Sequence, residues 1–410
     1  MDLRCVKKGL VAFVFLVFAW QGRAQVVLDL RPLEIELHAL RTANARLVQS
    51  FPSQPGLKWL FTPPKAVFSP FLPDYLRPNW SALRPRQLFD DLRSDPNAEK
   101  RIAAVLDSLK QRRGEIERFL SDRLRTTLWR SLTVPVKCYV AYVPGGNVRA
   151  AGYGRSVVVS IAHRVSLELP PRVDVEGFEA DALKAVYTFL DEDLLVSGDL
   201  LLEVTGNHAA VREDLISRYG FGWVSLASRV LGRQRHHRDP DLLREIVDRW
   251  GKVTTIDPHQ ASKAAEFFRE LARQGMAAWS AAPALGIPDS ALYLFQMHGA
   301  LSNLDQQSRR FHRAFDLVVV QNVVNASGPI QELTDMGVFE DLGLYMANRI
   351  EKVFGRDRLL RSFSKNEVEF FLDYVSCQEE ADLKFDDAVC EWGLNLANEL
   401  DRLVKLADQL

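Results

Sequence analysis

Two short runs rich in β-branched and aromatic residues limit the folds that this chain can adopt. They are VPVKCYVAYVPGG (134–146) and GRSVVVSIAH (154–163), and glycines separate them. Such runs are typical of neighbouring β-strands. After Pro171 the apolar residues recur at helical spacing instead. We therefore predict an α+β fold that is predominantly α-helical, with a small β-sheet at about 135–163 followed by a long helical region.

The order of these patterns also excludes some folds. Strand and helix patterns do not alternate, and the chain has no glycine-rich phosphate loop of the usual spacings, so a dinucleotide-binding fold is not expected. Before the strands, residues 97–132 carry apolar residues at helical spacing among many charges, which predicts one long or broken amphipathic helix. Later, Asp257 before Pro258 offers an N-cap and a first-turn proline, which predicts a helix start.

The N-terminus has the parts of a secretory signal peptide. A basic start is followed by an apolar run, and Gly22-Arg23-Ala24 places small residues just before Gln25. A membrane anchor is the alternative, but the apolar run is shorter than the roughly 20 residues that a spanning helix needs. We therefore expect residues 1–24 to be a signal peptide and the protein to be exported, periplasmic or secreted, with no membrane attachment after cleavage.

The next segment, residues 25–95, is rich in proline. Its stretches FPSQPGLKWLFTPP and FSPFLPDYLRPNW interrupt short helical patterns, because proline lacks a backbone donor and breaks helices. We expect this segment to cover the body of the protein irregularly. Residues 96–410 are then predicted to form a helical domain that also contains the sheet.

The overall charge argues against one class of partner. The chain has 52 Lys and Arg against 53 Asp and Glu, a formal net charge of −1. A nucleic-acid partner requires a concentrated basic face that neutralises phosphates. We therefore expect no nucleic-acid partner.

Three cysteines remain once the signal peptide is removed, too few for a disulfide scaffold. Cys377 and Cys390 flank QEEADLKFDDAV and could bridge two neighbouring helices, while Cys138 lies in a strand-like run. Spacing alone does not determine disulfide geometry, so buried free thiols are the alternative for all three.

Histidines are the natural candidates for chemistry, and the chain has eight. None is followed by glutamate, so the zinc helix His-Glu-x-x-His, whose two histidines face one metal, is absent as written. His208, in LLEVTGNHAAV, is either a remnant of such a helix or an ordinary histidine in a buried helix. A carboxylate cluster could bind a cation or be exposed surface; its members are Glu332, Asp335, Glu340 and Asp341.

Two later patterns carry a resemblance. ELARQGMAAW (270–279) is followed by GLYMANRIEKVFGR (343–356). In this order after the strands, they resemble a bacterial family of exported domains of unknown function that are described as zinc-dependent peptidases of the gluzincin type. The resemblance covers roughly residues 135–365 and implies a zincin-like fold.

In that family a His-Glu-x-x-His helix precedes a helix with Glu-Gly-apolar-Ala, whose glutamate is the third zinc ligand. The resemblance places Val204 and His208 at the two histidines, Thr205 at the glutamate and Gln274 at the third ligand. Valine cannot coordinate zinc, threonine cannot act as a carboxylate base, and glutamine is a poor neutral substitute for an anionic ligand. The resemblance therefore implies a degenerate site with no cofactor.

Three interpretations follow for the function. The first is an exported, catalytically degenerate peptidase-like protein that binds a peptide or a protein. The second is an active zinc metallopeptidase with non-standard ligands, such as His208 with Glu203 and a carboxylate near Glu270. The third is a helical interaction protein of the cell envelope without enzymatic ancestry.

Overall fold

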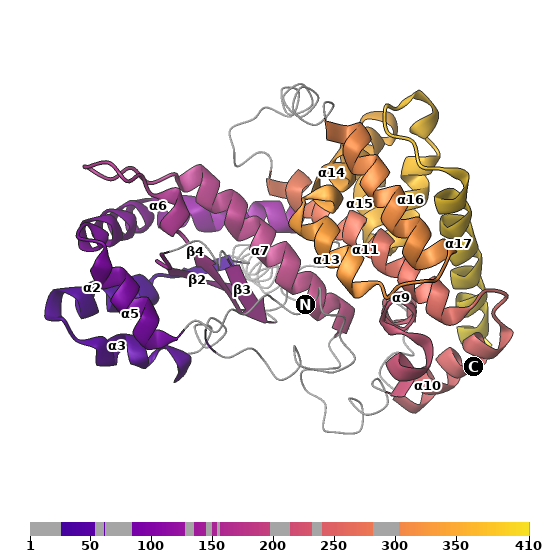
Figure 1. The fold of residues 1–410 in the computed structure, drawn as a ribbon, viewed down its shortest axis with the longest axis horizontal. Helices are drawn as coiled ribbons and strands as arrows, with labels where there is room; N and C mark the ends of the chain where they lie inside the picture. Colours follow the sequence, from indigo (N-terminus) through magenta and orange to yellow (C-terminus); the bar gives the residue numbers. More distant parts are fainter. Residues whose placement is uncertain are drawn as a thin grey trace, which may run out of the picture.

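The computed structural model of the chain is mostly helical and contains one small sheet (Figure 1). It describes residues 26–53, 61, 84–127, 135–144, 150–153, 156–196, 214–231, 240–281 and 303–409. The predicted signal peptide lies outside these residues. Within the described part of the chain, no helix is both long and apolar enough to cross a bilayer.

The elements fall into a sheet, the helices around it and a larger helical part. The strands are β1 (Val26–Asp29), β2 (Val136–Ala141), β3 (Ala150–Tyr153) and β4 (Ser156–Ser160). The helices near the sheet are α2 (Arg31–Thr42), α3 (Ala45–Gln49), α5 (Pro85–Ser94), α6 (Ala98–Thr127) and α7 (Val175–Val196). The helices of the larger part are α9 (Phe221–Leu231), α10 (Pro240–Val253), α11 (Pro258–Ala281), α13 (Ser327–Asp335), α14 (Val338–Phe354), α15 (Arg356–Lys365), α16 (Glu367–Val375) and α17 (Asp387–Ala407). Short helical turns are η1 (Phe51–Ser53), η4 (Ala162–Arg164), η8 (Gln378–Glu380) and the π-helical η7 (Asp316–Val320).

The sheet has the strand order β1-β2-β4-β3. β1, β2 and β4 are parallel, and β3 runs antiparallel to β4 at one edge. The predicted α+β class and the strands within 135–163 are confirmed. β1, however, comes from the segment that we expected to be an irregular cover, and its partner β2 lies far along the chain, as a parallel crossover requires.

The outer edge of β1 is closed by side chains of α6. The Val26 amide donates to Ser121 Oγ at 3.1 Å, and the Leu28 amide donates to Glu117 Oε1 at 2.9 Å. Arg113 Nη2 donates to the Leu28 carbonyl at 2.8 Å. These bonds occupy backbone groups that would otherwise attract another strand. The opposite edge strand, β3, pairs only with β4 among the described residues.

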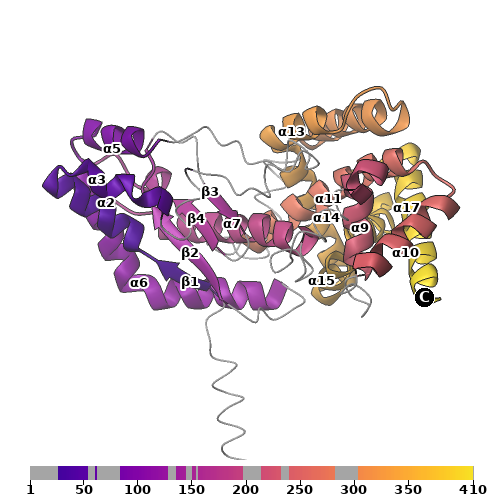
Figure 2. The same ribbon diagram turned by 90° about the horizontal axis from the view of Figure 1, so that it is seen from below.

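The buried side chains form two clusters. One contains the sheet together with α2, α5, α6 and α7, so β1 and its following helices belong to the same core as the rest of the sheet. The other fills the helical part from Leu215 to Ala407. α11 contributes to both, because Ala277 and Ala281 near its end belong to the sheet cluster. In Figure 2, α7 lies between the sheet and α11, and α7 contacts β3, β4 and α11.

The predicted long amphipathic helix is confirmed as α6, which is continuous from Ala98 to Thr127. The predicted start of α11 is confirmed as well: Asp257 Oδ1 accepts a hydrogen bond from the Gln260 amide at 2.7 Å, and Pro258 is the first helical residue. This cap satisfies an otherwise orphan helix amide. The cap fixes the residue at which α11 begins. The start of α11 in turn influences which of its side chains face the neighbouring helices.

Candidate functional site

The residues of the expected zinc site are divided between described and undescribed parts of the chain. Val204, Thr205 and His208 lie outside the described residues. Gln274 lies on α11, which is buried along nearly its whole length and contacts α7, α9, α14 and α16. A helix surrounded in this way carries apolar residues on most faces, so each polar side chain on it needs a partner.

Glu270 is the centre of a buried polar cluster on α11. Its side chain is fully buried, and its two oxygens accept hydrogen bonds from Arg269 Nη1 at 3.0 Å, from Arg273 Nε and Nη2, and from Gln274 Nε2 at 2.7 Å. Burial alone would raise the pKa of Glu270, but the charges of Arg273 and Arg269 hold that pKa below its ordinary value. Glu270 is therefore an ionised carboxylate whose oxygens are engaged by three side chains.

Gln274 joins this cluster to another helix. Its Nε2 atom donates to Glu270 Oε2 and, at 3.2 Å, to Thr334 Oγ1 on α13. The amide thus connects α11 with α13. Gln274 brings no negative charge, and Arg273 binds the same Glu270 oxygen, so a divalent cation at this position would meet a guanidinium group instead of an anionic ligand.

Arg269 adds to the positive charge of the cluster. Its exposed fraction is 1 %, and Nε and Nη2 have no hydrogen-bond partner within the described part of the chain. Its guanidinium carbon lies 5.6 Å from the centre of the Phe221 ring, which supplies a cation–π contact. Two guanidinium groups surround one carboxylate here, an arrangement that disfavours cation binding.

Two members of the predicted carboxylate cluster, Glu340 and Asp341, are bound to side chains outside the cluster. Lys184 Nζ on α7 lies 2.5 Å from Glu340 Oε1 on α14, and Gln307 Nε2 donates to Asp341 Oδ2 at 3.0 Å. Burial raises the pKa of Asp341, the charge of Glu340 adds to this, and the hydrogen bond from Gln307 offsets part of it. Within the residues described, no group of three or more His, Cys, Asp or Glu side chains could hold a metal ion.

A cluster of three polar side chains, which joins η4 to α7, was not predicted. His163 Nε2 lies 2.7 Å from Asp181 Oδ2, and Arg164 donates to both Asp181 oxygens at 2.7 and 2.8 Å. Burial raises the pKa of Asp181, but Arg164 and then His163 bring it below its ordinary value. The partners are 17 and 18 residues apart in sequence, so no local spacing could have indicated that they meet.

The disulfide considered for Cys377 and Cys390 is not formed in the structure, where both are free thiols. Cys377 Sγ donates to the Tyr374 carbonyl at 3.2 Å, and Cys390 Sγ accepts a hydrogen bond from Gln378 Nε2 at 3.5 Å. Each sulfur thus has a local partner. Cys138 is a free thiol as well, fully buried in β2.

Comparison with known proteins identifies no relative. No protein-family model matches the sequence, and neither a curated protein nor a solved structure matches the chain.

Proposed function

We propose that this chain is an exported protein with a zincin-like, zinc-peptidase-like fold whose metal site has been replaced, and that it binds a peptide or an extended protein segment. The observation that carries the proposal is the set of side chains that surround Gln274. Where the resembling family has an anionic ligand, this chain has an amide that is hydrogen-bonded to Glu270 and Thr334 beside two arginines.

The order of the elements supports the fold part of the proposal. A sheet with one antiparallel edge strand comes first, and α7 follows it and packs against both the sheet and α11. α11 carries the sequence Gln-Gly-Met-Ala at 274–277. α14 packs against α11 and carries Met346 and Ala347 of the run GLYMANRIEKVFGR. This is the order of patterns on which the resemblance rests.

The degenerate interpretation is supported whether the zinc helix corresponds to residues 204–208, as the resemblance places it, or to α7, which the structure places next to α11. The helix pattern at Val204 to His208 keeps one histidine. α7, the first long helix after the sheet, contains no histidine, and two of its polar side chains, Asp181 and Lys184, form ion pairs with Arg164 and Glu340. Neither segment contains the two histidines that hold zinc.

The competing interpretation, an active zinc peptidase, would need a carboxylate from the region of Glu270. That carboxylate is fully buried, and Arg269, Arg273 and Gln274 donate to its oxygens. Zinc coordination would have to displace these donors and leave two buried guanidinium groups without their carboxylate, which is energetically costly.

The binding part of the proposal rests on the two edges of the sheet. Side chains of α6 close the β1 edge, whereas β3 pairs only with β4 among the described residues. An edge strand with free backbone groups can add an extended peptide by main-chain hydrogen bonds. β3 is therefore the site at which we expect an extended segment to bind.

Metal analysis tests the degenerate site. Protein purified without chelator is expected to contain no stoichiometric zinc. The triple variant Val204→His, Thr205→Glu and Gln274→Glu should gain measurable zinc affinity, because its added carboxylate at position 274 offsets the second arginine of the cluster and it restores two further ligand-type side chains. Gln274→Glu alone is the matched control that should not gain zinc affinity. Stoichiometric zinc in the unmodified protein, or a folded triple variant that binds no divalent metal, would contradict the proposal.

A binding assay tests the second part. Fluorescently labelled casein, an unfolded chain, is the probe, and both anisotropy and fragment size are followed. We expect binding without cleavage, and slower amide exchange at residues 150–153 when casein is bound. Cleavage that stops when a chelator is added would establish an active metallopeptidase. No binding at all would favour an interaction protein without a peptide cleft.

A further inference from the structure

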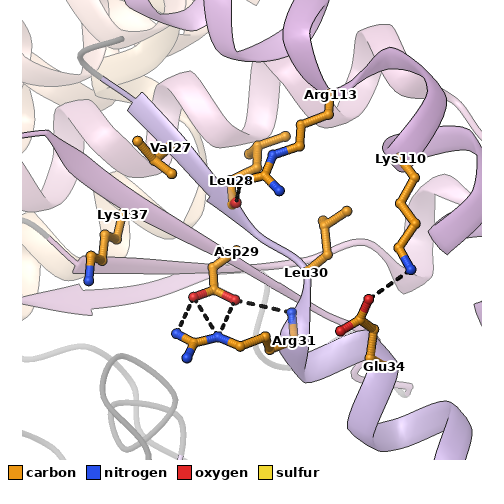
Figure 3. Close-up of a pocket in the computed structure, with 9 residues that line it drawn as sticks. All are labelled: Val27, Leu28, Asp29, Leu30, Arg31, Glu34, Lys110, Arg113 and Lys137. Atoms are coloured by element: carbon orange, nitrogen blue, oxygen red, sulfur yellow. Dashed lines mark hydrogen bonds and ion pairs between the residues drawn. The ribbon is translucent and has the colours of Figure 1, made fainter. Parts of the chain in front are cut away.

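A cavity of about 380 Å³ opens where β1 runs into α2 (Figure 3). Val27, Leu28 and Leu30 give it an apolar lining, and charged side chains from α2, α6 and β2 surround it. The volume lies within the range of small-molecule sites, which combine apolar walls with a few polar groups. The cavity is far in sequence from α11 and takes no part in the function proposed above.

The charges around the cavity are unequal. Its cations outnumber its carboxylates, the full charged set being Arg31, Lys110, Arg113, Lys137, Asp29 and Glu34. Both carboxylates are occupied: Arg31 binds both oxygens of Asp29, and Lys110 Nζ lies 2.7 Å from Glu34 Oε1. Arg113 is held by Glu117 and by the Leu28 carbonyl. Lys137 has no hydrogen bond or ion pair within the part of the chain that the structure describes.

Lys137 is unusual for its place in the sheet. It is the exposed residue of β2, and the other five residues of that strand are buried. Side chains alternate along a strand, so Lys137 shares a face with the buried Tyr139, and its register partner on β1 is Val27. An apolar side chain at position 137 would extend the core. The charged side chain of Lys137 borders the cavity instead.

Lys137, Asp29 and Arg31 lie on the same side of β1. The Asp29 carboxylate faces the Arg31 guanidinium, and Lys137 lies to one side of this pair (Figure 3). Burial raises the pKa of Asp29, but hydrogen bonds from Arg31 and then the charge of Lys137 bring it below its ordinary value, so Asp29 stays ionised. Asp29 neutralises one of the two cations. One positive charge remains, and both Lys137 Nζ and Arg31 Nη1 keep donors that no described residue accepts.

We propose that this cavity binds a small organic anion. Its carboxylate or phosphate group accepts hydrogen bonds from Lys137 Nζ and Arg31 Nη1, neither of which donates to Asp29, and its apolar body lies against Val27 on the same face of β1. Charge-assisted hydrogen bonds from two cations on separate elements hold the anionic group. Arg31 is already oriented by its three side-chain hydrogen bonds to Asp29, so less side-chain entropy is lost on binding.

The experiment is calorimetric titration of the full chain with three probes that share one ring: benzoate, phenyl phosphate and benzamide. At least one anion should bind, more weakly at higher salt, while the uncharged benzamide should not. The stronger of the two anions identifies carboxylate or phosphate as the natural group. Binding of benzamide as tight as that of the anions, or no binding of either anion, overturns the proposal.

Two lysine variants locate the site. Lys137→Gln should weaken anion binding about fivefold, as expected for loss of one exposed charge contact. Lys100→Gln is the control, because Lys100 is exposed on α6 and does not line the cavity. Circular dichroism checks that both variants fold. Equal affinity in the two variants places any binding elsewhere and overturns the proposal.

Discussion

Gly275 of α11 and Gly343 of α14 are in backbone contact where the two helices cross. A Cβ atom on Gly275 would lie 2.2 Å from the Gly343 carbonyl carbon, and a Cβ on Gly343 would lie 2.1 Å from the Leu271 oxygen. Real side chains do not approach backbone so closely, so each position excludes every residue except glycine at this helix separation. The contact sets the distance between α11 and α14, and it lies next to Gln274.

Gly275→Ala is expected to destabilise the protein by about 3 kcal/mol or more, because backbone has to move to accommodate the methyl group. Gly114→Ala is the matched control: Gly114 lies inside α6, and a methyl group there would have nothing within 4 Å of it. Helix propensity predicts that this second change stabilises the protein by up to about 1 kcal/mol. Urea unfolding measures both, and equal effects of the two changes would contradict the close crossing.

Glu270→Gln is expected to cost about 3–5 kcal/mol, because Arg269 and Arg273 would stay buried without their carboxylate. The control is Glu245→Gln, which breaks an ion pair with Arg249 in which both side chains are about half exposed. Such surface pairs contribute about 0.5 kcal/mol or less. Denaturant midpoints at neutral pH compare the two variants. A loss below about 1 kcal/mol for Glu270→Gln would show that the cluster does not stabilise the fold.

Glu36→Gln should flatten the pH dependence of stability. Glu36 on α2 is fully buried, and although the Tyr142 amide donates to Oε2 at 3.0 Å, burial raises its pKa well above 4.5. The folded protein therefore holds a proton that the unfolded chain has released. This contribution is complete below the unfolded pKa and is lost as pH rises toward the folded value. Urea unfolding at pH 5 and pH 8 should show a smaller decline in the variant, and parallel declines would refute the assignment.

The thiols give a chemical test of the cysteine assignments. Alkylation of the denatured protein without reductant, followed by peptide mass mapping, should label Cys138, Cys377 and Cys390. In the folded protein Cys138 should stay unlabelled, because it is fully buried and burial raises its pKa to about 12. If Cys377 and Cys390 resist alkylation until reductant is added, the protein contains the bridge that the structure lacks.

Elements with strong local patterns were predictable. The periodicity of residues 97–132 indicated α6, and Asp257-Pro258 marked the start of α11. β1 was missed because four residues give too little periodicity, and its strand character depends on pairing with β2 and on side chains of α6. Local sequence does not contain such distant partners.

The candidate site was likewise predictable from the sequence only in part. Residue types alone indicated that Gln274 brings no charge for a metal. One partner of its amide, Glu270, lies four residues earlier on the same helix, but the other, Thr334, depends on how α11 faces α13.

The sequence by itself determined the helical character, the presence of strands between 135 and 163 and the near-neutral charge, because these depend on residue type and local spacing. Only the tertiary structure decided the parallel pairing of β1, the glycine crossing of α11 and α14, and the contacts of Gln274 with Thr334 and of Lys184 with Glu340. Those contacts join residues distant along the chain. Their free energy comes from burial and from satisfying buried polar groups, which no segment achieves alone.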